Sequence, residues 1–496
     1  MDSHNILTTF WYIVGAWWLL FATAIALFIH QWIRVEHHPL SRLPGTWISK
    51  WSNIPAWIEL VKGRQPVYIH SLFEKYGPVV RIGPNQVCFC DMASLNQIYN
   101  VEEKFVKSYL HEAFVGSPAP NVFSTAEVEV HRRHRKLLEP VLSESAVAQL
   151  YPSVKSKIDL AIQRIGEETR REGSSDIYKW WTLTAADVSG ELTLGQSLGI
   201  LENGKKDEFI EELQDGSILT LARVILPFII PIAEYISLGP VTRACTARKK
   251  TYQRSQEILF KHRDAAKADP SSLPPSLFAR FLAEQDQENL DPLEVVSNAV
   301  TFLANGTDTT AGTLTYLVWS VCRHPEVRVQ LSEELDELPE GFDDRHLRRL
   351  TYLNQVIEET LRLYPAVAGG LLRTTPPEGA QIGGYWIPGG TTVSCQAYSM
   401  HRDPKIFPNP FVFYPERWTE PSTEMRMAMM AWGGGARTCL GIHLARMELR
   451  LGAALFFRAF PQARISDTAG MADGDMEPEM ISFTTPRGHK CLMECK

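Results

Sequence analysis

The sequence predicts a mainly α-helical domain with a minor β region, preceded by an N-terminal transmembrane helix. Three observations predict this fold class: an uncharged apolar run near the N-terminus, a long central portion with helical periodicity, and short apolar runs on either side of that portion. The chain has 496 residues, of which 45% are hydrophobic and 22% are charged, so it can bury a large core. The sequence shows neither a linker rich in Gly and Ser nor an internal repeat, which favours one large catalytic unit.

The N-terminal apolar run, residues 6–33, contains no Asp, Glu, Lys or Arg. A membrane span needs about 20 apolar residues, so the run is long enough. A cleavable signal peptide would begin with positive charge and be shorter, whereas this chain begins MDSHN. The first positive charges, Arg34 and Arg42, follow the run, so the positive-inside rule places the catalytic unit in the cytosol. We therefore expect the anchor to remain uncleaved. The chain is expected to divide into an N-terminal tail and anchor helix (1–34), a linker and surface segment (35–65) and a catalytic domain (66–496).

Charge and cysteine usage exclude several classes of partner and site. The formal net charge is −7 and no run is rich in Lys and Arg, which argues against nucleic acid as a partner. The chain has eight cysteines, none of them in a CxxC pair. This usage indicates neither a disulfide framework nor a structural zinc site, and it suits a reducing compartment.

Short strands are predicted on both sides of a helical portion. The runs VVRIG at 79–83 and QVCFC at 86–90 are apolar and lie between Pro and Gly residues, as small strands do. Helical periodicity dominates from about residue 125 to about residue 365, and short strands and turns return after it.

The clearest single helix is predicted over Asp291–Arg323. Asp291 can cap it, Pro292 suits its first turn, and Glu294 can complete a capping box. At 1.5 Å per residue it would be roughly 50 Å long and cross most of a domain of this size. Its middle, ANGTDTT at 304–310, is rich in poor helix formers, which suggests a local distortion with a purpose. The alternative is that the threonines bond back to the preceding turn and merely bend the helix.

A Gly-rich loop with one cysteine, AWGGGARTCLG at 431–441, precedes a helical pattern over Ile442–Phe457. The glycines let the backbone pass close to a flat or bulky group. Cys439 stands just before the helix, where backbone N–H groups lower a thiol's pKa, and a thiolate is a metal ligand. Arg437 can neutralise an anionic group such as a carboxylate. A buried structural cysteine is the commoner fate of a lone Cys, but the combined spacing favours a ligand.

This loop resembles the cysteine loop of the cytochrome P-450 superfamily, F-x-x-G-x-R-x-C-x-G. Gly435, Arg437, Cys439 and Gly441 match the pattern, and Trp432 departs from it by replacing the usual Phe. The resemblance implies the P-450 fold, haem b as the cofactor, and Cys439 as the thiolate that holds the haem iron. Trp432 keeps an aromatic ring beside the thiolate.

Two further elements follow the family's order. ETLR at 359–362 fits E-x-x-R on an amphipathic pattern, and PERW at 415–418 resembles the family's P-E-R-F. The resemblance implies a buried network of Glu359, Arg362 and Arg417 that serves structure and haem incorporation. On a solvated helix, E-x-x-R would be only a weak surface pair.

The segment NGTDTT at 305–310 resembles the family's [A/G]-G-x-[D/E]-T-[T/S], which lies over the oxygen-binding face of the haem. The resemblance implies that Asp308 and Thr309 relay the protons that O–O cleavage requires, while a cysteinate ligand favours that cleavage. Asn305 departs from the usual small residue and brings a polar side chain near the distal pocket. Asn305-Gly306-Thr307 is also a glycosylation sequon, which a buried cytosolic helix should keep silent.

The haem propionates need cationic or hydrogen-bonding partners. The family's corresponding positions are His131 and Arg135, in the segment HRRHRK, together with Arg373 and Arg437. The alternative for HRRHRK is a solvated basic helix face, which would also serve as part of a reductase-docking surface.

The expected partners follow from the resemblance. The chain is too short to include a flavin reductase, so electrons must come from a separate protein, and the anchor points to an NADPH–cytochrome reductase carrying FAD and FMN. Cytochrome b5 is a second candidate donor. We expect a single-pass protein of the endoplasmic reticulum membrane with its catalytic domain on the cytosolic side.

The substrate is expected to be a hydrophobic small molecule, because the segments that correspond to the family's pocket have few charges. These segments are 108–125, 215–240, 366–372 and 480–485. The apolar stretch 221–236 could dip into the membrane surface or be ordinary core. The chain resembles fungal secondary-metabolism members of the superfamily, which implies a terpenoid, polyketide or alkaloid scaffold.

Two rival functions remain at this point. A haem-thiolate isomerase or dehydratase rearranges a peroxide without a reductase, but such relatives typically lose the acid–Thr pair that Asp308 and Thr309 retain. A non-catalytic haem sensor or carrier would have no use for a proton-relay helix, and a sensor normally has an attached output domain.

Overall fold

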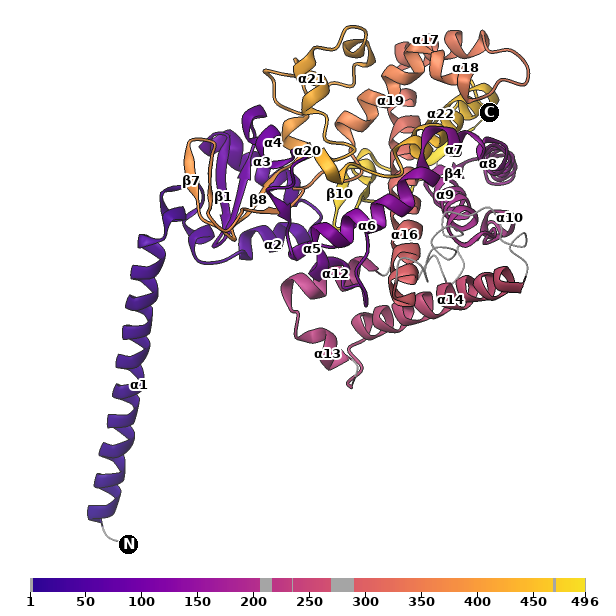
Figure 1. Cartoon of the computed structure of the whole chain (residues 1–496). Helices are drawn as coiled ribbons and strands as arrows, with labels where there is room; N and C mark the ends of the chain where they lie inside the picture. The colour runs from indigo at the N-terminus through magenta and orange to yellow at the C-terminus, as the bar shows by residue number, and fades with distance from the viewer. Residues whose placement is uncertain (1–2, 206–215, 234, 269–289, 467–469, 496) are drawn as a thin grey trace.

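The fold follows the sequence in placing one apolar helix outside a mainly helical body (Figure 1). The computed structural model describes residues 3–205, 216–233, 235–268, 290–466 and 470–495. Helix α1, Ser3–His37, extends away from the body as a single rod. Its segment Trp11–His37 has a mean hydropathy of 2.1 over its most apolar window, and that window is not buried against the rest of the chain. A helix of this length and composition can cross a bilayer.

The described helices account for most of the body. They are α2 Ile54–Val61, α3 Gln65–Tyr76, α4 Met92–Ile98, α5 Leu110–Val115, α6 Val128–Leu138, α7 Glu144–Ala148, α8 Tyr151–Glu172, α9 Ile177–Leu194, α10 Ile200–Asn203, α12 Gly216–Ile225, α13 Ile229–Ala233, α14 Pro240–Ala268, α16 Pro292–Arg323, α17 Pro325–Asp336, α18 Asp344–Arg349, α19 Thr351–Leu363, α20 Ala397–Met400, α21 Thr423–Ala428 and α22 Ile442–Ala459. Short 3-10 turns lie at Pro39–Arg42, Trp47–Lys50, Glu139–Leu142, Pro415–Trp418, Gly435–Arg437 and Asp473–Met476.

The minor β region consists of short strands. They are β1 Val79–Gly83, β2 Gln86–Phe89, β3 Val106–Lys107, β4 Ser175–Asp176, β5 Arg373–Thr374, β6 Ala380–Ile382, β7 Tyr385–Ile387, β8 Thr392–Cys395, β9 Arg464–Ile465, β10 Pro478–Met480, β11 Thr484–Pro486 and β12 Leu492–Glu494. The largest sheet has the order β1-β2-β8-β5-β3, with β2 and β8 parallel. The strands predicted at 79–83 and 86–90 are therefore present as β1 and β2.

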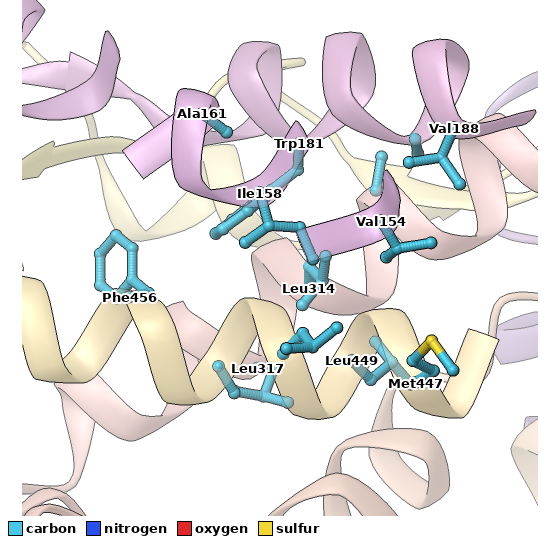
Figure 2. Packing of buried hydrophobic residues seen from close by; sticks show 14 of the residues in the cluster. Val154, Ile158, Ala161, Trp181, Val188, Leu314, Leu317, Met447, Leu449 and Phe456 are labelled. Atoms are coloured by element: carbon cyan, nitrogen blue, oxygen red, sulfur yellow. The ribbon is translucent and has the colours of Figure 1, made fainter. Parts of the chain in front are cut away.

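The core lies where α8, α9, α16 and α22 meet (Figure 2). Trp181 of α9 and Phe456 of α22 are fully buried with their rings 6.2 Å apart, and Leu317 of α16 is fully buried in the same cluster. Dense apolar packing of this kind fixes the relative positions of helices. It therefore sets the position of α16 relative to α22, which begins directly after the cysteine loop.

A glycine allows α9 and α16 to pack closely. A Cβ atom at Gly306 would lie 2.4 Å from the side-chain oxygen of Ser189 on α9, so a larger residue would force the helices apart. Gly306 belongs to the segment that sequence analysis assigned to the distal pocket, and it has this packing function as well.

Helix α16 begins and ends as predicted but differs in two details. Asp291 caps it by accepting from the Leu293 N–H at 2.8 Å. The predicted capping box is wrong, because the Glu294 carboxylate instead contacts Arg133 Nη2 at 2.6 Å and His134 Nε2 at 2.7 Å. These groups of α6 offer a charged partner, which binds a carboxylate more strongly than a backbone N–H does.

The expected distortion in the middle of α16 is also absent. The helix is unbroken from Pro292 to Arg323. The Thr307 hydroxyl donates to Leu303 O at 2.7 Å, and the Thr309 hydroxyl donates to Asn305 O. The back-bonding alternative is therefore the observed one, because each hydroxyl finds its acceptor one turn earlier without breaking the helix.

Candidate functional site

The cysteine loop passes close to the sheet side of the body before it enters α22. Gly435 has φ +62°, and a Cβ there would lie 2.4 Å from Asn100 O, so only glycine fits. The Cys439 N–H donates to Trp432 O at 2.9 Å, which closes the loop. Gly441 is the N-cap residue of α22 and donates its N–H to the Cys439 sulfur.

The Cys439 thiol lies at the start of α22 and experiences opposing effects on its pKa. Its side chain is accessible, yet burial raises the pKa of the thiol more than the Gly441 N–H and the Arg135 charge lower it. The backbone N–H at the helix start lowers the pKa of the thiol as expected, but desolvation outweighs it, so the net direction is upward. Coordination to a metal would remove the proton and reverse this balance.

Three buried cations gather beside the loop; we call Lys107, Arg373 and Arg437 the cationic cluster. Lys107 of β3 and Arg373 of β5 stand directly opposite each other in the antiparallel ladder. Like charges at opposed positions destabilise a strand pair. Burial, followed by the charges of Arg373 and Arg437, holds the pKa of Lys107 well below its usual range.

The cationic cluster has little negative charge of its own. Within the described part of the chain its carboxylate contact is Glu103, which accepts from Arg437 Nε at 2.8 Å. Arg437 Nη1 donates to Thr125 O at 2.8 Å, whereas its Nη2 is buried without a hydrogen-bond partner. Lys107 and Arg373 donate to the backbone carbonyls of Phe123 and Leu372.

The His131 and Arg135 side chains extend the cluster from α6. His131 is buried, its Nδ1 has no hydrogen-bond partner, and burial together with the Arg437 charge lowers its pKa to about 3. Arg135 Nη1 donates to Ala436 O at 3.1 Å and Thr438 O at 2.9 Å, so it binds the cysteine loop itself.

These residues fit the propionates of the expected haem. Buried cations facing each other, a guanidinium nitrogen without an acceptor and an unpaired imidazole nitrogen all favour an anion between them. Two carboxylates would supply the missing charge, and the neutral His131 can donate one hydrogen bond from its ring.

The distal residues lie along α16. Thr309 and Asp308 are both partly accessible, as is Asn305 one turn earlier. Asp308 lies toward α9, where its charge adds to the effect of burial in raising the pKa of Tyr178. Thr310 points the other way, toward α22, and its hydroxyl donates to Glu448 at 3.5 Å. The predicted alcohol, Thr309, lies between Asp308 and Thr310 in the chain, and its hydroxyl donates to Asn305 O of its own helix.

The structure brings Glu359, Arg362 and Arg417 together in the interior. Arg362 forms a bidentate ion pair with Glu359, with Nε and Nη2 each 2.8 Å from a carboxylate oxygen. Arg417 Nε donates to the same carboxylate at 3.0 Å, and Trp418 Nε1 donates at 3.0 Å. Arg362 also donates to the His401 carbonyl at 2.8 Å, so the network connects α19 to the segment that leads into the cysteine loop.

Sequence reasoning missed three residues of this site. Lys107 and Glu103 belong to no motif, and the one available signal was a lysine that directly follows the apolar pair Phe105-Val106. Glu448 is 5% exposed, and burial raises its pKa to about 8. It lies on the predicted helix after Cys439, where an acid within an apolar face indicated a buried carboxyl group.

Comparison with known proteins identifies the relatives of this chain. The family model described as cytochrome P450 matches residues 45–488. Cytochrome P450 monooxygenase tazI of Aspergillus terreus is 39% identical over 473 residues, which cover 95% of this chain and 96% of that protein. Cytochrome P450 monooxygenase orf2 of Aspergillus niger is 36% identical, with 93% and 94% covered. Cytochrome P450 monooxygenase stcB of Emericella nidulans is 32% identical, with 94% and 90% covered.

The fold has a counterpart among solved structures. Retinoic acid bound cyanobacterial CYP120A1 superposes with a TM-score of 0.74, covering 91% of this chain and 98% of that chain. The sequence identity is 20%, so this likeness concerns the fold alone.

Proposed function

Because the chain belongs to the cytochrome P450 family and is a haem-thiolate monooxygenase, we propose that Cys439 is its thiolate ligand and that the cationic cluster binds the haem propionates. The observation that carries this assignment is one accessible thiol beside buried cations with too little negative charge. A thiolate can bind the haem iron, and cations can bind the two haem propionates. Together these contacts hold a haem in one orientation.

Residues in and around the cysteine loop stabilise the negative charge of the Cys439 thiolate and hold the loop in place. When bound, a cysteinate-ligated haem supplies the activation of dioxygen for insertion of one oxygen atom into the substrate. The Gly441 N–H and the Arg135 charge both stabilise negative charge on the Cys439 sulfur. The Trp432 backbone carbonyl accepts from the Cys439 N–H, and the Arg446 guanidinium lies 5.5 Å from the centre of the Trp432 ring, so both contacts hold the loop in place.

We propose that Asp308 and Thr309 move the protons. In the structure the Thr309 hydroxyl donates its one hydrogen to Asn305 O, and its oxygen can also accept a hydrogen bond. In the proposed relay the hydroxyl rotates away from Asn305 O, so that it donates this hydrogen toward the oxygen-binding side. Asp308 is the neighbouring acid, and its side chain is partly accessible. Glu359, Arg362 and Arg417 are assigned to structure and haem incorporation, because they bond to one another, to backbone groups and to the Trp418 ring N–H.

P450 monooxygenases bind hydrophobic substrates, and we infer that this one acts on a secondary metabolite with a terpenoid, polyketide or alkaloid scaffold. Support comes from relatives in Aspergillus terreus, Aspergillus niger and Emericella nidulans. Exposed apolar residues around α13 agree with a lipophilic ligand: Leu226 and Phe228 lie in the turn between α12 and α13, and Ile232 lies on α13.

The family requires a redox partner, and we propose an NADPH–cytochrome reductase with FAD and FMN, with cytochrome b5 as a second donor. The apolar helix α1 supports membrane attachment, and the Arg34 charge after the span supports a cytosolic catalytic domain on the endoplasmic reticulum.

The test is turnover in microsomes under ¹⁸O₂, with substrates taken from a metabolite comparison of cells with and without the gene. The expected product carries one ¹⁸O atom and forms only with NADPH and reductase. Product formation from a hydroperoxide without reductase would instead establish the isomerase or dehydratase function.

A further inference from the structure

Two arginines converge on the C-terminal end of α5. Arg223 of α12 donates from Nη1 to Phe114 O at 3.4 Å and to Val115 O at 3.3 Å. Arg248 of α14 donates from Nη2 to Gly116 O at 3.0 Å. Each guanidinium therefore uses one of its three nitrogens, and each acceptor is a neutral backbone carbonyl.

The two charges stand close enough to repel. Burial and the Arg248 charge lower the pKa of Arg223 to about 10. Neither arginine is paired with a carboxylate anywhere in the described part of the chain. Buried Arg362, by contrast, has a two-pronged contact with Glu359. The bonds of Arg223 are long, and Arg248 has one ordinary bond to a carbonyl and lies 5.3 Å from the centre of the Tyr252 ring. These neutral partners leave the positive charge of the two guanidiniums without a counter-ion among the described residues.

The same pattern occurs in this chain at the cationic cluster. There, Arg373 is buried and its protein acceptor is the Leu372 carbonyl at 3.1 Å. We have assigned its missing negative charge to a haem propionate. The Arg223–Arg248 pair also lacks a negatively charged partner, but it belongs to other elements of the fold. We therefore expect it to bind an anion other than a haem propionate.

The position of the pair indicates where that anion comes from. Helices α5 and α12 lie in the segments 108–125 and 215–240, which we expected to line the substrate pocket. Gly116 has φ +54°, and a Cβ there would lie 2.3 Å from Arg223 Nε. A glycine at this turn is therefore what allows the guanidinium to cross the end of α5.

We propose that Arg223 and Arg248 bind an acidic group of the substrate, a carboxylate or an ionised phenol, and so select hydrophobic acids over their neutral analogues. This inference rests on the proposed monooxygenase function. The competing explanation is purely structural: the carbonyl end of a helix attracts cations, so the arginines would only fasten α5 to α12 and α14. The two explanations differ in whether the ligand's charge matters.

The experiment compares acid and amide pairs of equal shape on the full-length haem-loaded protein in nanodiscs. The probes are 2-naphthoate against 2-naphthamide and dodecanoate against dodecanamide, titrated by the shift of the Soret band on binding. For at least one pair, the acid should bind about tenfold or more tightly than the amide, as expected for hydrogen bonds to a charged group. Arg223→Gln should reduce that preference to about twofold or less, and Arg223→Lys should keep part of it.

Arg263→Gln is the matched control, because Arg263 lies on α14 and already pairs with Asp264 at 3.2 Å; the preference should persist in it. The proposal is overturned if neither acid binds, if acid and amide bind equally, or if Arg223→Gln weakens both to the same extent. The spectrum of the reduced protein with carbon monoxide, recorded on each sample, tests the thiolate ligand separately. A normal spectrum with no acid preference refutes this inference alone.

Discussion

Replacing Lys107 with Met should weaken haem binding and at the same time stabilise the haem-free chain. Lys107 is buried opposite Arg373 in the β3–β5 ladder, and Arg437 lies near both. With an anion bound, the ammonium group makes a charge-assisted hydrogen bond. Without one, it is a desolvated cation facing another cation.

The magnitude follows from these contacts. A hydrogen bond to a charged group contributes about 1.5–3 kcal/mol, so the variant should lose haem about 10- to 100-fold faster. In the haem-free chain the pKa of Lys107 is depressed. A basic group whose pKa is lower in the folded than in the unfolded state decreases the free energy of unfolding at low pH, where it is protonated in both states. This destabilisation declines as the pH rises from the folded pKa toward the unfolded pKa. The haem-free variant should therefore unfold at a higher temperature than the parent, most clearly at neutral and lower pH.

The assay is haem transfer to an excess of apomyoglobin, followed by absorbance, together with thermal unfolding of the haem-free protein. Lys104→Met is the matched control, because Lys104 is exposed and pairs with Glu102 at 2.9 Å. The reasoning is refuted if Lys107→Met loses haem at the same rate as Lys104→Met. A haem-free variant less stable than its parent would refute the electrostatic part.

Three further predictions concern the other parts of the site. Thr309→Ala should uncouple NADPH oxidation from product and release peroxide, whereas Thr309→Ser should stay coupled; unchanged coupling in the Ala variant would remove the hydroxyl from proton transfer. Glu359→Gln leaves Arg362 and Arg417 buried without a carboxylate, which should cost about 3–5 kcal/mol and lower the yield of haem-loaded protein, measured by haem content and denaturant unfolding. Glu448 has a pKa raised to about 8, so its folded state favours the neutral acid and stability declines as pH rises from about 4.5 to about 8. Glu448→Gln should flatten that decline in melting temperature, and an unchanged pH profile would contradict the assignment.

The fold class and the ordered motifs could be predicted because residue identity carries them. Cys439 and the Glu359–Arg362 pair are recognisable by spacing along one stretch of chain, and the structure places the pair in direct contact in the interior. The apolar helix α1, a candidate membrane span, could be predicted for the same reason, since one run of apolar residues specifies it.

Properties that depend on distant neighbours could not be predicted. Lys107 meets Arg373 only through strand register, and nothing in either local sequence specifies that pairing. Glu294 has the spacing of a capping box, but His134 of another helix competes for its carboxylate. The pKa of Cys439 is raised mainly by desolvation, which depends on how much protein surrounds the thiol in the folded chain. The position of Cys439 at the start of a helix does not predict this burial.

The most direct test of the account is the absorption spectrum of the reduced full-length protein with carbon monoxide. The parent should show the red-shifted Soret band of a cysteinate-ligated haem. Cys439→Ser should lose that band, while Cys245→Ser, a change at a partly exposed thiol on α14, should keep it. A red-shifted band that survives in Cys439→Ser would contradict the assignment of the ligand, and the roles assigned to the loop would fail with it.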